Sequence, residues 1–165
     1  MQVLTSFLEM RAAPSAPRAS SPDPAYTLER VDWTPDAYRD LYHAVGDPVG
    51  WTSRLEMTDG ELARLLRDPL FELVVLFRCT VACGFFEIDR RVAGEAELAH
   101  FGLTPAAQGL RLAPWMLDAA VRRGWSTPIS RLWLHTDACD SPRALGLYQQ
   151  AGFVVYEETY ISYPA

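Results

Sequence analysis

The sequence predicts an α/β protein in which a single mixed sheet carries helices. Three observations support this prediction. Residues 26–31 alternate polar and apolar side chains, and other short apolar segments recur along the chain, as in strands. Longer segments with apolar residues three or four positions apart lie between them, as in amphipathic helices. From residue 26 onward the expected elements follow the order β-αα-βββ-α-β-α-β, which is typical of one sheet with helices packed on it.

The bulk composition indicates a soluble cytoplasmic protein. The 165 residues suit one domain, with 49% hydrophobic and 22% charged residues. No apolar run approaches the roughly 18 residues of a membrane helix, and the first ten residues lack the basic stretch of a signal peptide. The three cysteines form no complete set of pairs, so we expect free thiols. A formal net charge of −6 without any basic run argues against nucleic acid as a partner.

The first 25 residues are expected to form an arm and a linker ahead of the domain at residues 26–165. Apolar spacing leaves residues 1–10 open as a strand or a turn of helix. Residues 12–25 are rich in Pro, Ala and Ser, which is typical of a linker. Either the domain surface or a partner subunit must hold this linker, so a homodimer is one of the two alternatives.

The elements of the domain are expected in alternating order along the chain. Strands are expected at residues 26–31, 71–78, 81–88, 94–103, 130–136 and 153–163, and helices at residues 33–45, 58–68, about 110–124 and 141–152. Start signals support three of the helices. Thr34 with Pro35, and Ser141 with Pro142, provide an N-cap residue followed by a proline, and Thr58 with Glu61 fits a capping box. A tight turn at Cys79 joins the second and third strands.

Three segments in succession carry residues that suit catalysis. Glu97 lies on the strand at 94–103, on the face of Ala99 and opposite Leu98 and His100. It is either a general base in a cleft or a solvent-facing carboxylate. The loop at 104–113 either holds phosphate on free N–H groups at a helix start or is an ordinary turn. Tyr148 is either a catalytic group or a packing residue. His43, His100, His135 and the cysteines show no metal-binding spacing, so we expect no metal.

The order of these segments resembles the GNAT N-acetyltransferase superfamily over roughly residues 26–160. The family's loop Gln/Arg-x-x-Gly-x-Gly/Ala falls on Gln108, Arg111 and Ala113, with Arg111 in place of Gly. The family's Asn-x-x-Ala-x-x-x-Tyr, followed by Gly-Phe, falls on Ser141, Ala144, Tyr148, Gly152 and Phe153, with Ser in place of Asn. A bacterial subset without an assigned substrate is closer still, through Leu41, Tyr42, Val45, Gly46 and Trp51, residues 101–105, and residues 132–136. Absence of Lys and Asn also suggests a GC-rich bacterial genome.

The resemblance implies a GNAT-like central mixed, mostly antiparallel sheet of six to seven strands flanked by about four helices. It also implies acetyl-CoA as co-substrate, without a metal, and acetyl transfer to a primary amine on a small molecule or at an N-terminus. Two strands would separate to admit the pantetheine arm. The residues expected to contact acetyl-CoA are Phe101, Gly102, Leu103, Gln108, Gly109, Leu110, Arg111, Leu112, Ala113, Ser141, Arg143 and Tyr148.

Roles for individual residues follow from the same resemblance. The N–H of Leu103 would polarise the thioester carbonyl, Glu97 would be the general base and Tyr148 the general acid. Tyr42, Trp51 and Arg54 are candidates for the acceptor site, or else they serve packing and surface charge. Arg111 is expected to keep an ordinary helical φ and to turn its side chain outward onto a phosphate; the alternative is that the side chain fills the site and blocks CoA. The alternatives are an acyl-CoA sensor without turnover, or a scaffold that binds no CoA and interacts through its N-terminal arm.

Overall fold

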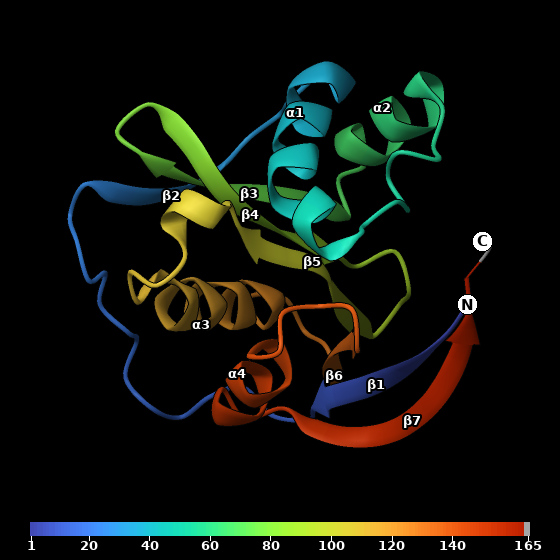
Figure 1. The fold of residues 1–165 in the computed structure, drawn as a ribbon. Helices are drawn as coiled ribbons and strands as arrows, with labels where there is room; N and C mark the ends of the chain where they lie inside the picture. The colour runs from blue at the N-terminus through green and yellow to red at the C-terminus, as the bar shows by residue number, and fades with distance from the viewer. Residues whose placement is uncertain (164–165) are drawn as a thin grey trace.

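The computed structural model describes residues 1–163 and contains one seven-stranded sheet in the order β2-β3-β4-β5-β6-β1-β7 (Figure 1). The last two residues of the expected domain, 164 and 165, lie outside the described residues. Four helices and two short 3-10 helices complete the fold. The elements are β1 (Gln2–Met10), β2 (Tyr26–Arg30), α1 (Pro35–Gly46), η1 (Asp47–Val49), α2 (Asp59–Arg67), β3 (Phe71–Arg78), β4 (Val81–Asp89), β5 (Glu95–Leu103), η2 (Pro105–Ala107), α3 (Leu112–Gly124), β6 (Arg131–Asp137), α4 (Ala144–Gln150) and β7 (Val154–Ser162).

The sheet is mostly antiparallel, as expected, and separates two hydrophobic cores. Its one parallel pair is β5 with β6, and the other neighbours run antiparallel. Helices α1 and α2 cover one face, where Tyr38, Leu62 and Phe85 are buried together. Helices α3 and α4 cover the other face, where Met116 and Leu132 belong to a second core (Figure 1). Alternating side chains of the central strands therefore contribute to both cores.

The first ten residues form a strand inside the sheet, which resolves the choice that apolar spacing left open. Strand β1 lies between β6 and β7 and pairs with both. Leu8 and Met10 point into the core under α3 and α4. The boundary expected at residue 25 is therefore not a boundary of the folded unit, because long-range pairing places β1 within it.

The linker between β1 and β2 lies along helix α3. The Nη2 of Arg122 donates a 2.8 Å hydrogen bond to the carbonyl of Ala16. The backbone N–H of Ala19 donates a 3.0 Å hydrogen bond to Asp118 Oδ2. The domain surface thus holds the linker through two polar contacts from one helix.

The predicted caps are confirmed for two helices and wrong for a third. Thr34 Oγ1 accepts a hydrogen bond from Ala37 N, and Thr58 with Glu61 forms the complete capping box. Helix α4 begins at Ala144 instead of just after Ser141. The Ser141 Oγ instead accepts a 3.4 Å bond from the backbone N of Arg143, which makes a local turn ahead of the helix.

A bulge in β5 corrects the predicted faces of that strand. Glu87 pairs with His100 while Ile88 pairs with Leu98, so Ala99 is the extra residue on β5. The inserted residue reverses the alternation, and His100 therefore lies on the same sheet face as Glu97. Both point toward the side of the sheet covered by α1 and α2.

Candidate active site

Strands β5 and β6 separate partway along their length. Their parallel pairing runs from Glu95–Arg131 to Glu97–Trp133, although β5 continues to Leu103 and β6 to Asp137. The backbone N–H of Thr104 donates to Cys83 O on the β4 side. Because successive N–H groups of an extended chain point in opposite directions, the N–H of Leu103 faces β6. The separation thus exposes strand backbone to a ligand that lies between β5 and β6, as the resemblance implied.

The loop between β5 and α3 has two residues in the left-handed region. Gly109 has φ 77°, and Arg111 has φ 61° and ψ 22° at the N-cap of α3. The expectation of an ordinary helical φ at Arg111 was wrong, because the chain must turn sharply before it enters the helix. For a residue with a Cβ, this conformation costs roughly 1–2 kcal/mol. A glycine here would avoid that cost, so Arg111 occupies a position where the backbone conformation favours glycine.

The side chain of Arg111 is available to a ligand. Arg111 is exposed, and among residues 1–163 it forms no ion pair and no side-chain hydrogen bond. Nearby, Gln108 Nε2 donates a 3.3 Å bond to the carbonyl of Leu103 and ties the loop to the strand end. Arg111 itself supplies no side-chain cap to α3, so the first N–H groups of the helix are left for an anion. The loop can therefore hold a diphosphate.

Tyr148 lies on α4 beside the end of β5. Its ring packs edge-on against Phe101, with centroids 6.1 Å apart, and against Phe153, with centroids 6.2 Å apart. Burial, and after it the charge of Asp140, raises the pKa of the Tyr148 hydroxyl. Within the described residues this hydroxyl has no hydrogen-bond partner. It therefore stays protonated over the working pH range and is free to donate to a bound ligand.

A buried carboxylate, which sequence reasoning missed, organises the opposite side of the strand end. Glu87 on β4 is fully buried and accepts a hydrogen bond from the hydroxyl of Tyr38. Arg54 Nη2 lies 2.8 Å from Glu87 Oε2, and His100 Nδ1 lies 2.7 Å from the same oxygen. Burial alone would raise the pKa of Glu87, but His100 and Arg54 together hold it well below its usual range. A charged residue at a core position of a strand was the signal for this network.

The other nitrogen of His100 faces two hydroxyl groups. Its Nε2 lies 3.3 Å from Tyr42 OH and 3.3 Å from Ser53 Oγ. Since Nδ1–H of His100 donates a hydrogen bond to the carboxylate of Glu87, Nε2 is the ring nitrogen that a neutral imidazole leaves as an acceptor. His100 Nε2 therefore lies on the face of the sheet that also carries Glu97.

The three residues expected at the acceptor site lie together on this face but are engaged in internal contacts. Tyr42 is fully buried, and Arg54 is bonded to Glu87. Trp51 packs edge-on against His100, with centroids 4.9 Å apart, and its Nε1 donates a 3.0 Å bond to Asp140 Oδ1. A Cβ on Gly102 would lie 2.5 Å from Val45 Cγ1 and 3.1 Å from Trp51 Cη2, so only glycine permits this packing.

Glu97 remains partly open beside this network. Its side chain is 24% exposed, and its Oε1 lies 3.8 Å from His135 Nδ1. Burial, and after it the charge of Asp89, raises the pKa of Glu97 above its usual value. A carboxylate with a raised pKa accepts a proton more readily than an ordinary one. Glu97 thus lies at the last paired position of β5 with β6, His100 lies three residues further along on the same sheet face, and Tyr148 lies beside Phe101 on the other face.

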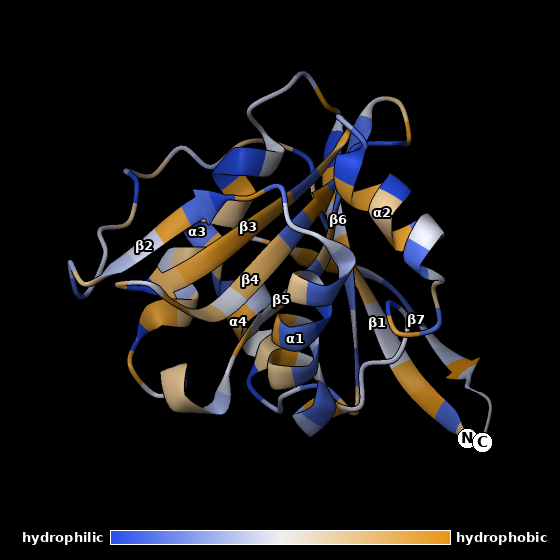
Figure 2. Ribbon diagram, turned by 90° about the horizontal axis from the view of Figure 1, so that it is seen from above, coloured by the Kyte–Doolittle hydropathy of each residue, from blue (hydrophilic) through white to orange (hydrophobic). Residues whose placement is uncertain are grey.

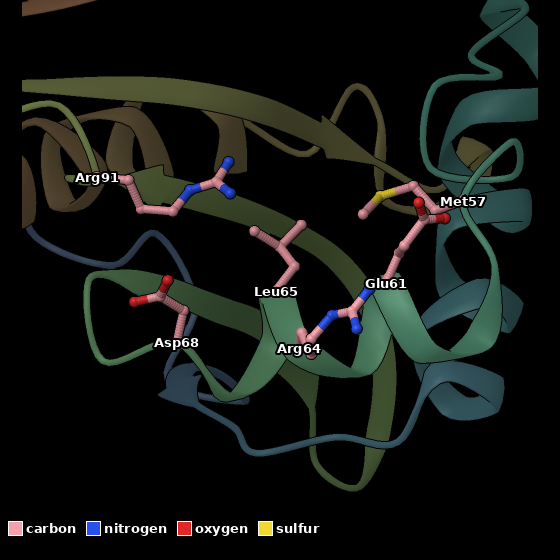
Figure 3. Close-up of a pocket in the computed structure, with 6 residues that line it drawn as sticks. All are labelled: Met57, Glu61, Arg64, Leu65, Asp68 and Arg91. Carbon is pink, nitrogen blue, oxygen red and sulfur yellow. The ribbon is translucent and has the colours of Figure 1, made fainter.

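A cavity of about 270 Å³ lies away from this region. It opens between α2 and Arg91 of the β4–β5 turn (Figure 3). Its lining residues are Met57, Glu61, Arg64, Leu65, Asp68 and Arg91. Two carboxylates face two guanidinium groups, so the cavity has no net preference for charge.

Among residues 1–163, no three His, Cys, Asp or Glu side chains are placed to hold a metal ion. In that same part of the chain, every helix is too short or too polar to cross a membrane.

The family model of the acetyltransferase (GNAT) family matches residues 22–153. The chain therefore belongs to this family. The match includes β5, the loop at Gln108–Arg111, and the helix that carries Tyr148. No curated protein matches the chain in sequence.

Solved structures share the fold at low sequence identity. A GCN5-related N-acetyltransferase from Sphaerobacter thermophilus has a TM-score of 0.67 and 20% identity, covering 96% of this chain and 50% of that one. A conserved protein of unknown function from Staphylococcus epidermidis has a TM-score of 0.67 and 16% identity, covering 97% and 60%. An aminoglycoside acetyltransferase from an uncultured soil sample, in complex with trehalose, has a TM-score of 0.68 and 14% identity, covering 87% and 97%. The chain thus spans 50% to 60% of the first two structures.

Proposed function

We propose that this protein transfers an acetyl group from acetyl-CoA to a primary amine. The observation that carries the proposal is the separation of β5 from β6 between the Arg111 loop and Tyr148. The unpaired backbone at Phe101–Leu103 would hold the pantetheine arm. The N–H groups at the start of α3, with the Arg111 guanidinium, would hold the diphosphate. Acetyl-CoA supplies an acyl group activated as a thioester.

The residues along β5 and on α4 suit direct attack by the amine. The N–H of Leu103 would donate to the carbonyl oxygen as negative charge develops there. The amine nitrogen forms the new C–N bond, and the C–S bond breaks. Glu97 would take the proton that the ammonium must lose, and Tyr148 would give a proton to the departing thiolate. His100, held by Glu87, is the second candidate for the base, because it lies on the same face and has an accepting nitrogen.

An acyl-CoA-binding module without turnover is the second candidate function. It is favoured by the Trp51–Asp140 hydrogen bond, which joins the loop after α1 to the chain after β6 on the acceptor side of the site. If that contact never opens, an acceptor amine cannot reach the thioester while CoA still binds.

Two measurements on the full chain separate these functions. Acetyl-CoA at millimolar concentration should raise the melting temperature, because a ligand that binds only the folded state stabilises it. Release of free CoA thiol should then appear with a panel of primary amines. A thermal shift without thiol release would support the binding module. If acetyl-CoA causes no thermal shift and calorimetry finds no binding either, the chain is a scaffold and the proposal fails.

A further inference from the structure

The sheet face that carries Glu97 continues onto strands that α1 and α2 leave uncovered. These helices pack over β3, β4 and β5, where the core that contains Tyr38, Leu62 and Phe85 lies. Seen from their side of the sheet, β1 and β7 have no helix above them (Figure 2). Trp133 and His135 of β6 and Phe7 of β1 point to this face, since Glu97 pairs with Trp133 and Phe7 pairs with His135.

These side chains form an aromatic surface next to the carboxylate of Glu97. The ring centroids of Phe7 and Trp133 lie 6.5 Å apart, and those of Phe7 and His135 lie 5.8 Å apart. Tyr156 of β7 extends the surface, with its centroid 6.3 Å from that of Phe7. Phe7 and Trp133 are partly exposed, whereas Tyr156 is exposed. Each of these rings keeps part of its surface accessible, although Arg131 lies over Trp133 and Tyr156, so they can contact a flat partner.

The charges on this surface favour a cation. Arg131 lies over the rings of Trp133 and Tyr156 at 5.5 Å, but its guanidinium is already paired with Glu95 and Glu9. Glu97 has no comparable partner in the described part of the chain, since its nearest basic atom is His135 Nδ1 at 3.8 Å. A ligand ammonium at Glu97 would therefore balance the negative charge of this carboxylate, and an attached ring would reach the aromatic surface.

We propose that the acceptor is an aromatic ring that carries a primary amine on a short chain, with the ring on Phe7, Trp133 and Tyr156 and the ammonium at Glu97. This inference rests on the proposed function and adds the class of acceptor. The carboxylate selects the cation, and the rings select the flat group. An aliphatic amine would use only the carboxylate, so it should bind more weakly.

The test compares two amines of nearly equal size. Phenethylamine and 2-cyclohexylethylamine carry the same ammonium and chain, but only phenethylamine has a π-face. With acetyl-CoA and the full chain, phenethylamine should show a lower KM by roughly threefold to tenfold, the factor expected for one aromatic contact. Phe7→Leu should remove this preference by raising the KM of phenethylamine toward that of 2-cyclohexylethylamine.

Two exposed tyrosines of β7 supply a matched pair of variants that do not disturb the core. Tyr156→Thr removes a ring of the aromatic surface. Tyr160→Thr removes a ring that is 66% exposed, and Tyr160 pairs with Leu4, which points to the opposite face. The first variant should raise the KM of phenethylamine severalfold, and the second should leave it unchanged. This pair keeps the test valid even if Phe7→Leu fails to fold.

The outcomes distinguish this inference from the proposed function. Turnover of aliphatic amines without any aromatic preference would overturn the inference and leave acetyl transfer intact. If no amine is acetylated, calorimetry of phenethylamine in the presence of CoA becomes the deciding measurement. Binding that Tyr156→Thr weakens would keep the aromatic site in a protein without turnover. Absence of both turnover and binding would overturn both proposals.

Discussion

The imidazole of His100 is bound to the carboxylate of Glu87 across neighbouring strands, with Nδ1 2.7 Å from Oε2. The two residues are paired in register, and the bulge at Ala99 is what brings His100 to the face of Glu87. Arg54 reaches the same carboxylate from the loop after α1. One buried acid therefore fixes a strand, a loop and a histidine beside the candidate site.

Replacing Glu87 should destabilise the fold strongly. Glu87→Gln leaves the guanidinium of Arg54, whose side chain is only 14% exposed, without its charge partner. We expect the free energy of unfolding to fall by about 3–5 kcal/mol, the usual cost of breaking a buried pair. Urea unfolding measures this change, and exposed Glu157→Gln serves as the control, with an effect within about 0.5 kcal/mol. Equal urea midpoints for Glu87→Gln and the parent would contradict the structural role.

The lowered pKa of Glu87 predicts that the stability lost in Glu87→Gln depends on pH. The pKa of Glu87 is lower in the folded chain than its ordinary value of 4.5. Its stabilising contribution is therefore complete above pH 4.5 and is lost as the pH falls toward the folded-state pKa. The difference in unfolding free energy between the parent and Glu87→Gln should narrow below that pH. A difference that stays constant down to pH 3 would show that Glu87 is not held as a carboxylate.

Glu97→Gln should reduce the rate of acetyl transfer most at low pH, where few amine molecules are already neutral. Because burial raises the pKa of Glu97 above 4.5, the rate of the parent should begin to fall at a higher pH than for an ordinary glutamate. A pH–rate profile of both proteins checks this, with His100→Gln measured alongside. If Glu97→Gln keeps the parent profile and His100→Gln loses the acid limb, the base is His100.

Tyr148→Phe should preserve the fold and acetyl-CoA affinity. The ring contacts with Phe101 and Phe153 do not involve the hydroxyl. The rate of acetyl transfer should fall on the order of 100-fold, as expected for loss of a general acid. Thiol release at saturating substrate measures the rate, and calorimetry measures the affinity. Turnover equal to that of the parent would make Tyr148 a packing residue.

Arg111 should show opposite effects on binding and on stability. Arg111→Ala keeps a Cβ at positive φ and loses the guanidinium, so CoA binding should weaken by roughly tenfold. Arg111→Gly should weaken binding equally, while the unliganded fold is equally stable or gains up to about 1 kcal/mol. The affinity loss should shrink at high salt. Tighter CoA binding by either variant would show that the side chain obstructs the site.

Local patterns in the sequence predicted most of the elements. Alternation at residues 26–31 and short apolar segments further on identified the strands, and the capping residues Thr34 and Thr58 identified two helix starts, because these signals act over a few residues. The GNAT resemblance added the order of the segments and the separation of two strands near Phe101.

What the sequence did not predict depends on distant or subtle geometry. The place of residues 2–10 depends on pairing with residues more than a hundred positions away, which apolar spacing does not encode. The bulge at Ala99 inserts one residue without any change in composition, yet it moves His100 to the other face. Glu87 is a charged residue at a core position of its strand, but its partners on α1, on β5 and in the loop at Arg54 are identified only in the folded structure.

The position of β1 determines the order in which the sheet can be completed. Its neighbours, β6 and β7, are the last two strands of the chain. During synthesis, the side chains of Leu8 and Met10 therefore stay exposed to solvent until nearly all of the remaining chain has been made. Contacts of such long sequence separation slow folding, because the chain must close a large loop before they form. If β1 has not inserted by the time β6 and β7 are made, these two strands have a strand-wide gap between them, and an unpaired edge of this kind can accept the first strand of another molecule.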